Sequence, residues 1–241
     1  MKIGLVYDLR DDYRAMGYSE EQTAEFDSVE TVDSVAGALE RLGHEVVRVG
    51  HGKKLAQRFV IGERFDLVFS FAEGLSGRNR EAQVPALCEL YDQPYAFSDA
   101  LTMSVCLDKS VAKRLVRDAG VATAPFIVIN GDGADISGWC HYPAFVKPLA
   151  EGTGKGCELG SKVASRSELD NAARALLHRF RQPVLVEAFL PGREFTVGIV
   201  GNGADARVIG VIEILLNANA EQGVYSMNNK ENSEELCSYV R

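Results

Sequence analysis

A lysine at the end of an apolar run is followed closely by a loop of glycines. The run is Tyr142-Pro143-Ala144-Phe145-Val146-Lys147-Pro148, and the loop is Glu151-Gly152-Thr153-Gly154-Lys155-Gly156. Because glycine has no Cβ, its backbone N–H groups can turn toward an anion. The pattern predicts a strand that carries a cation and a loop that wraps phosphate groups.

A second strand pattern follows after one helix-length interval. Val184-Leu185-Val186-Glu187 is an apolar run that ends in a carboxylate, and residues 189–197 continue it. The two strands and the glycine loop together indicate a nucleotide clamp. For Lys147 the alternative is an edge-strand lysine that discourages aggregation.

Composition excludes several classes of protein. The chain has 241 residues, of which 46% are hydrophobic, enough for one large domain or two or three smaller ones. A formal net charge of −8 argues against a general nucleic-acid binder, because such proteins neutralise many phosphates with Lys and Arg. The first apolar run is too short for a signal peptide, and no run reaches membrane length. We therefore expect a cytoplasmic protein without a nucleic-acid or membrane partner.

Cysteines and histidines are not spaced as metal ligands. The five cysteines form no Cys-x-x-Cys pair, and the four histidines form no His-x-x-x-His pair. We expect reduced cysteines that mainly pack in the interior, with no disulfide framework and no metal site.

Strand and helix signals alternate in the first part of the chain, which predicts a parallel α/β sheet. One helix has the clearest limits: Asp27 and Glu30 resemble a capping box at its start, and Gly43 stops it. The expected strands are 2–7, 45–49, 65–71 and 94–97, and the expected helices are 28–42 and 81–90.

The segment from Asp11 to Glu25 is polar and has no apolar period, so we expect a loop. Such a loop lies either over the carboxyl ends of the strands, where α/β sheets bind ligands, or on the surface without a specific role. After a helix at 108–119, an extended run at 124–129 begins a second, α+β part. There Ser167 is expected to cap a helix that ends near Phe180, and 208–214 to form a strand.

Taken in order, five motifs resemble those of ATP-grasp ligases of the D-alanine:D-alanine ligase type. The resemblance covers essentially the whole chain. It implies a parallel α/β pre-ATP-grasp domain at 1–107 followed by an incomplete ATP-grasp fold, with a central subdomain at 108–186 and the start of a C-terminal subdomain at 187–241. The motifs are Leu107-Asp108-Lys109-Ser110-Val111-Ala112-Lys113, Phe145-Val146-Lys147-Pro148, Glu151 to Gly156, Val186-Glu187-Ala188-Phe189-Leu190 and Arg193-Glu194-Phe195-Thr196-Val197.

The resemblance implies a site for the phosphates of ATP. Lys109 and Lys147 would hold the α and β phosphates, because that role needs permanent positive charge on fixed elements. The loop residues implied as cofactor-binding are Glu151, Gly152, Lys155 and Gly156. From the residues alone, Lys109 is also explained as a solvated helix lysine, and Lys155 as a lysine that faces water.

It also implies a site for the adenosine part. Glu187 would accept a hydrogen bond from the adenine amino group, and Ala188 and the Leu190 backbone would belong to the hinge. Phe189 would form a wall, with core packing as the alternative. Glu194 would hold the ribose hydroxyls, since a carboxylate accepts two donors at once.

Catalytic candidates follow from the same comparison. Thr153 and Gly154 would offer donors to the γ-phosphate or to a reacting carboxylate. Lys230, in the segment Val224 to Glu231, would stabilise charge that develops on the phosphoryl group. The alternative for Lys230 is a frayed lysine near a chain end.

The first part departs from the family pattern. Residues 71–83 stand where the D-alanine enzymes have a His-Gly and a Gly-Glu-Asp-Gly pattern, Phe97 stands at a family glycine, and Glu231 at a family tyrosine. Glu73, Arg78 and Arg80 are then candidates for binding another amino acid or carboxylate. The alternative is a structural turn with surface charges.

The family's magnesium ligands lie in an Arg-x-Asp and a Glu-x-Asn segment, and the sequence ends at Arg241 before either. We therefore expect magnesium with ATP but no metal ligands in this chain, and impaired phosphoryl transfer or completion by a partner. A shortened gene product is the other explanation.

The resemblance implies an ATP-dependent carboxylate–amine ligase that acts through an acyl phosphate on small-molecule substrates, and a homodimer. The alternative is a nucleotide-binding or scaffold protein that keeps the fold without the chemistry. The sequence does not identify the substrates or their stereochemistry.

Overall fold

The structure is a computed structural model that describes residues 1–241. The chain forms two compact units, Met1–Leu115 and Val116–Arg241. The boundary between the two units falls inside one helix. The three domains expected from the sequence, 1–107, 108–186 and 187–241, stay predictions.

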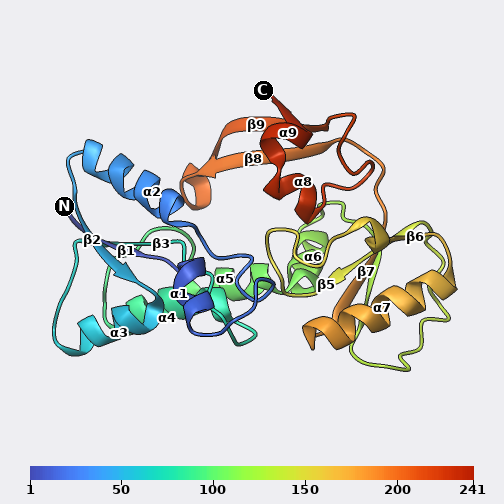
Figure 1. Ribbon diagram of the computed structural model, residues 1–241, viewed down its shortest axis with the longest axis horizontal. Coiled ribbons are helices and arrows are strands. Elements are labelled where there is room, and N and C mark those ends of the chain that lie inside the picture. The colour runs from blue at the N-terminus through green and yellow to red at the C-terminus, as the bar shows by residue number, and fades with distance from the viewer. The chain divides into compact units, whose positions relative to one another are not determined.

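The first unit is a parallel α/β layer structure (Figure 1). Its sheet has the order β2-β1-β3, and both pairings are parallel, which confirms the predicted fold class. In chain order its elements are β1 (Lys2–Val6), α1 (Arg10–Ala15), α2 (Val29–Arg41), β2 (Glu45–Gly50), α3 (Gly52–Val60), β3 (Leu67–Ser70), the 3-10 helix η1 (Arg80–Ala82), α4 (Gln83–Leu90), α5 (Ala100–Leu107) and the start of α6 (Lys109–Asp118).

Alternating side chains of β1 build two cores, one on each face of this sheet. Leu5 packs with Val32 and Ala36 of α2, whereas Val6 packs with Leu55 of α3 and Val84 of α4. Figure 1 shows α2 on one face and α3 and α4 on the other. Because the strand period is two, this alternation buries both faces of the sheet.

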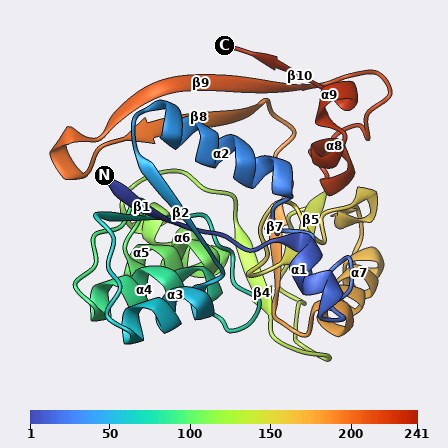
Figure 2. The same ribbon diagram turned by 60° about the vertical axis from the view of Figure 1, so that its left-hand side comes forward.

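The second unit contains two antiparallel sheets with the orders β4-β7-β5-β6 and β10-β9-β8. Figure 2 shows β8 and β9 as a long hairpin. Its elements are β4 (Phe126–Ile129), β5 (Ala144–Pro148), the 3-10 helix η2 (Leu159–Ser161), β6 (Lys162–Val163), α7 (Arg166–Phe180), β7 (Val184–Ala188), β8 (Glu194–Val200), the 3-10 helix η3 (Gly203–Asp205), β9 (Arg207–Leu216), α8 (Met227–Glu231), α9 (Ser233–Leu236) and β10 (Cys237–Val240).

Helix α7 covers one face of the four-stranded sheet. Leu169, Ala173 and Leu176 of this helix pack against Val146 of β5 and Val186 of β7. On each strand, the residue next to the valine that faces α7 therefore points to the opposite face of the sheet. Lys147 of β5 and Glu187 of β7 are two of these residues.

Four local predictions are wrong. The segment Asp11 to Glu25 is not only loop, because its start belongs to α1. The cap of α2 is Ser28, not Asp27: its hydroxyl accepts from the Thr31 N–H at 3.3 Å. Residues 94–97 form only an isolated bridge between Tyr95 and Val68.

The fourth error concerns α7, whose cap is Ser165 and not Ser167. The Ser165 hydroxyl accepts from the Glu168 N–H at 3.3 Å, and the Glu168 carboxylate accepts from the Ala164 N–H at 2.8 Å. This reciprocal arrangement fixes the first turn two residues earlier than the sequence predicted.

No helix of the structure is both long enough and apolar enough to span a membrane.

Candidate functional site

The glycine loop of the second unit has a backbone that few other residues could adopt. Thr153, Gly154 and Gly156 have φ values of +54°, +87° and +76°. A Cβ on Gly156 would lie 2.6 Å from Cγ of Pro148, which no real Cβ tolerates. Glycine is therefore required at 156 for both reasons. Turns of this kind point successive N–H groups to one side and make a concave site for an anion.

Glu151 and Lys155 hold this loop from within. Their side chains form an ion pair at 2.8 Å, and each is 12% exposed. The Gln182 amide donates to the same Glu151 carboxylate at 2.5 Å, which ties the loop to the segment between α7 and β7. Lys155 thus points into the protein, and the interpretation of a lysine that faces water is wrong.

Lys147 lies on β5 beside the loop and faces Glu187 of β7. Their Nζ and Oε1 atoms are 2.5 Å apart, and the side chains are 22% and 15% exposed. The register pairs Phe145 with Glu187 and Lys147 with Leu185, so the two charged residues are diagonal neighbours on one face. At its start β5 lies between β7 and β6, so it is not a simple edge strand.

Two aromatic rings and a second lysine extend this face. The rings of Phe145 and Phe189 are 6.4 Å apart at a tilt of 31°, and Lys162 Nζ lies 4.2 Å from the centroid of Phe189. Lys147 Nζ lies 5.8 Å from the Phe145 centroid. The face therefore combines flat apolar surface with two cations, which suits a planar ring attached to phosphates. Sequence reasoning missed Lys162, because nothing in its local pattern separates it from a surface lysine.

The segment after Glu187 has mixed exposure. Ala188 and Phe189 donate their N–H groups to the carbonyls of Pro125 and Pro143, both at 3.0 Å. Leu190 is 67% exposed. Glu194 begins β8, in the other sheet of the unit, and is also exposed.

Lys230 is positioned against the glycine loop. A Cβ on Gly154 would lie 3.5 Å from both Cδ and Nζ of Lys230. The Met227 N–H, at the start of the same helix α8, donates to the Cys157 carbonyl at 3.2 Å. Lys230 thus belongs to a docked helix, and the interpretation of a frayed terminal lysine is wrong.

Buried polar residues fix the α8 segment. Asn229 is fully buried and donates to the carbonyls of Glu221 and Val224 at 2.9 and 2.8 Å. Ser226 caps the helix by accepting from the Asn229 N–H and donates its hydroxyl to the Glu221 carboxylate. The Ser-x-x-Asn spacing is the signal that could have indicated this cap.

Lys109 begins helix α6 in the first unit. The preceding Asp108 is the anchor of that helix, because its carboxylate accepts from the Ser110 hydroxyl at 2.8 Å and from Arg78 at 2.6 Å. Burial alone would raise the pKa of Asp108, but the hydrogen bonds from Arg78 and Ser110 hold it below the usual range. Arg78 therefore ties a loop to this helix start, with its side chain 80% exposed.

Arg80 is the centre of a carboxylate cluster in the first unit. Its guanidinium, 7% exposed, lies 2.7 Å from Glu25, 3.4 Å from Glu73 and 3.5 Å from Glu81. Burial and then the charges of Glu81 and Glu25 raise the pKa of Glu73 to about 7. Arg80 is thus buried, and the alternative interpretation of a surface charge is wrong for this residue. Glu25 and Glu81 were not identified from sequence, because the fold alone brings them to Arg80.

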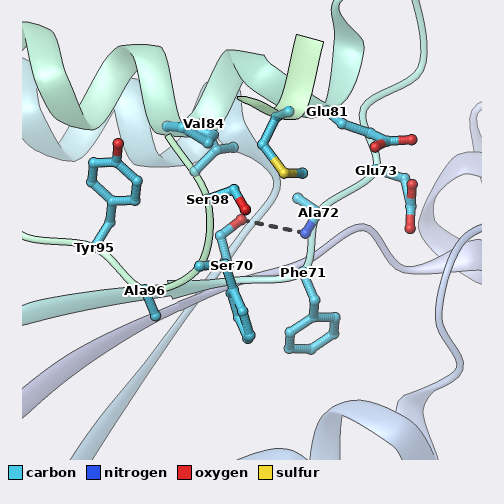
Figure 3. Close-up of a pocket in the computed structure, with 12 residues that line it drawn as sticks. Ser70, Phe71, Ala72, Glu73, Glu81, Val84, Tyr95, Ala96 and Ser98 are labelled. Atoms are coloured by element: carbon cyan, nitrogen blue, oxygen red, sulfur yellow. Dashed lines mark hydrogen bonds between the residues drawn. The ribbon is translucent and has the colours of Figure 1, made fainter. Parts of the chain in front are cut away.

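Glu73 and Glu81 line a small cavity of about 110 Å³ at the end of β3. Figure 3 shows both carboxylates on one side of it, and the Ala72 N–H that donates to the Ser70 hydroxyl at 3.3 Å. Ser98 and Tyr95 complete its polar lining. A cavity with a protonatable carboxyl suits a small polar ligand.

Comparison with known proteins gives a consistent result. Residues 115–240 match the family model described as D-ala D-ala ligase C-terminus. The uncharacterized protein y4sG of Sinorhizobium fredii is 32% identical over 191 residues, which are 76% of this chain and 55% of that protein. The D-alanine--D-alanine ligase of Aquifex aeolicus is 34% identical over 199 residues, 82% of this chain and 63% of that protein. The chain thus spans between about half and two thirds of the length of these curated relatives.

Solved structures show the same fold. The D-alanine--D-alanine ligase from Bacillus anthracis has a TM-score of 0.71 at 20% identity, covering 92% of this chain and 67% of that chain. Its complex with ATP has a TM-score of 0.68 at 21% identity, covering 91% and 67%.

Proposed function

Because this chain belongs to the D-alanine–D-alanine ligase family of ATP-grasp proteins, we propose that it acts in ATP-dependent joining of a carboxylate to an amine. The observation that carries the proposal is Lys147, fixed on β5 beside a loop whose Thr153, Gly154 and Gly156 have left-handed backbones. A fixed cation beside turned N–H groups is suited to phosphate.

We propose that this chain holds ATP through two sets of residues. Lys147, Lys109 and the loop from Glu151 to Gly156 would bind the phosphates. Glu187, Ala188, Phe189, Leu190 and Glu194 would bind the adenosine. The left-handed backbones of Thr153, Gly154 and Gly156 support this fit, since turns of this kind direct N–H groups toward an anion. When bound, ATP supplies the phosphoryl group that activates a carboxylate.

Lys230 would stabilise the charge that develops on the transferred group, because its ammonium lies against Gly154. Thr153 and Gly154 would donate N–H groups to the same oxygens. Since a lysine that acts only in the transition state affects rate more than affinity, Lys230→Met should lower kcat and leave ATP affinity nearly unchanged.

Magnesium is expected with ATP. No group of three or more His, Cys, Asp or Glu side chains in residues 1–241 is arranged to hold a metal ion. We therefore assign no residue to it.

The carboxylate or amine substrate would bind in the first unit, at the small cavity lined by Glu73 and Glu81. Glu73 would bind an ammonium group when ionised. Arg78 and Arg80 would act indirectly, since Arg78 pairs with Asp108 and Arg80 faces three carboxylates.

A nucleotide-binding protein without turnover is the second candidate. The engagement of Arg78 and Arg80 by internal carboxylates favours it, because it leaves these cations less available to a substrate. Phosphate release with ATP, magnesium and amino acid mixtures separates the two. Release by the wild type that is lost in Lys230→Met supports the ligase, whereas ATP binding without release under all mixtures supports the second candidate.

We also propose a homodimer in the cytoplasm. Light scattering of the purified chain over a range of concentrations tests the dimer, and a constant monomer mass would contradict it.

A further inference from the structure

The ammonium of Lys230 lies over the face of an aromatic ring and not against a carboxylate. Its Nζ is 5.1 Å from the centroid of the Tyr225 ring, and no Asp or Glu side chain forms an ion pair with it within 4.0 Å. By contrast, Lys147 and Lys155 each form an ion pair with a glutamate of the same unit. Lys230 therefore keeps an uncompensated positive charge, while the neighbouring ring restricts where that charge can lie.

The Tyr225 ring is itself fixed through its hydroxyl. That hydroxyl lies 3.1 Å from the hydroxyl of Tyr239 on β10, so one of the two donates to the other. Burial and then this hydrogen bond raise the pKa of Tyr225, which keeps its ring neutral. Because the face of a neutral tyrosine ring is electron-rich, it attracts an ammonium group without neutralising it.

Strand register connects this tyrosine pair with Glu194. Tyr239 of β10 pairs with Ile214 of β9, and Ile214 pairs in turn with Glu194 of β8. Residues that pair across neighbouring strands project from the same face of a sheet. One face of this sheet therefore carries both the anchor of Tyr225 and the carboxylate proposed to hold the ribose.

Lys230 also has the glycine loop as a neighbour. A Cβ on Gly154 would lie 3.5 Å from its Nζ, and the Met227 N–H of the same helix donates to the Cys157 carbonyl at 3.2 Å. One ammonium group is thus close both to the loop and to the ring of Tyr225. Because that ring is tied to β10, it can set the position of the ammonium relative to the loop.

We propose that Tyr225 is a positioning residue whose ring, fixed by the Tyr239 hydroxyl, holds the ammonium of Lys230 at Gly154 with its full charge available to the transferred phosphoryl group. A carboxylate in place of the ring would attract the ammonium more strongly, but it would repel the charge that develops on the phosphate oxygens. This inference rests on the proposed function, because it states how Lys230 is held for the role proposed there.

Three substitutions in the full chain test this role. Tyr225→Leu removes the ring, Tyr225→Phe keeps the ring, and Phe195→Leu removes an aromatic ring from the opposite face of the same sheet. Phosphate release with ATP, magnesium and amino acid mixtures should show a kcat about tenfold lower in Tyr225→Leu, with a nearly unchanged KM for ATP. Tyr225→Phe should keep most of the kcat, and Phe195→Leu all of it.

NMR of lysine ¹³Cε groups follows Lys230 without turnover. Its signal is the one that disappears in Lys230→Met, and the ring current of Tyr225 displaces that signal upfield. The signal should move downfield in Tyr225→Leu and stay nearly in place in Tyr225→Phe. Tyr239→Phe changes a side chain that is 51% exposed, so it keeps the test independent of how Tyr225→Leu folds. It should move the signal part of the way, because the ring loses its anchor.

The inference is overturned if the Lys230 signal is the same in the wild type, Tyr225→Leu and Tyr239→Phe, or if folded Tyr225→Leu keeps the kcat of the wild type. Failure of the proposed function gives a different result: the wild type would bind ATP and release no phosphate with any mixture. The NMR signals would then decide by themselves whether Tyr225 holds the ammonium.

Discussion

Lys147 and Glu187 face each other across two antiparallel strands, with their charged atoms 2.5 Å apart and both side chains mostly buried. Glu187 therefore fixes the ammonium on the face away from α7. Because the ion pair holds the ammonium in place, the site is ordered before any ligand arrives. A bound phosphate would then share this ammonium with Glu187.

This ion pair should show coupling in a double-mutant cycle. Lys147→Met leaves the Glu187 carboxylate, 15% exposed, without the cation that it faces, and should lower the free energy of unfolding by about 1–3 kcal/mol. Adding Glu187→Gln should restore part of the loss, with a coupling energy of about 1 kcal/mol. Urea unfolding of the four proteins measures it, and additive effects would show that the pair contributes nothing.

Gly156→Ala should destabilise the second unit strongly. Its φ of +76° and a Cβ position 2.6 Å from Pro148 both oppose a side chain, so we expect a loss of about 2–4 kcal/mol. Gly160→Ala is the matched control, because a Cβ there has no neighbour within 4 Å. It should change stability by less than about 0.5 kcal/mol. Equal losses in thermal unfolding would refute the role of Gly156.

Ser165→Ala should cost about 1 kcal/mol, because its hydroxyl caps α7 by accepting from the Glu168 N–H. Ser167→Ala removes an exposed hydroxyl inside the same helix and should be nearly neutral. Chemical denaturation compares the two. If Ser167→Ala were the more damaging, the cap would lie where the sequence alone had placed it.

Glu73 should make stability depend on pH. Its pKa is raised to about 7 from an ordinary 4.5, so the folded protein keeps a proton that the unfolded chain releases. This contribution is fully present below about pH 4.5 and is lost as pH rises through about 7. The free energy of unfolding should therefore fall with a slope of up to about 1.4 kcal/mol per pH unit in that window.

Glu73→Gln should flatten that slope, because the amide does not titrate. Urea unfolding between pH 6 and pH 8 is the best window, since Asp27, with a pKa raised to about 6, contributes mainly below it. Parallel slopes in the wild type and Glu73→Gln would assign the titration to another group.

Elements with strong periodicity and clear stops were predicted well. Helix α2 has Val32 and Ala36 on its buried face and Gly43 after its end, and strands β5 and β7 are short apolar runs. Helix α3 was missed, because its N-cap is His51, its first residue is Gly52 and it buries only Leu55 and Phe59. The expected strand at 94–97 fails at Phe97, whose φ of +74° does not fit a strand.

The site was predicted where its residues are neighbours in sequence. The closely spaced glycines 152, 154 and 156 predict a loop from the sequence alone, and Lys147 precedes them on one predicted strand. The cluster around Arg80 depends on Glu25, which lies before α2, while Glu73 follows β3. These carboxylates lie close to one guanidinium only in the folded protein, so no local sequence pattern could predict the cluster.

Calorimetric titration of the chain with ATP and magnesium tests the central claim most directly, with the wild type, Lys147→Met and Arg174→Met. Arg174 lies on the exposed side of α7 and serves as a charge-matched control. We expect binding by the wild type and Arg174→Met, and at least about tenfold weaker binding by folded Lys147→Met. No binding by the folded wild type, or equal affinity in all three proteins, would contradict an ATP site built on Lys147.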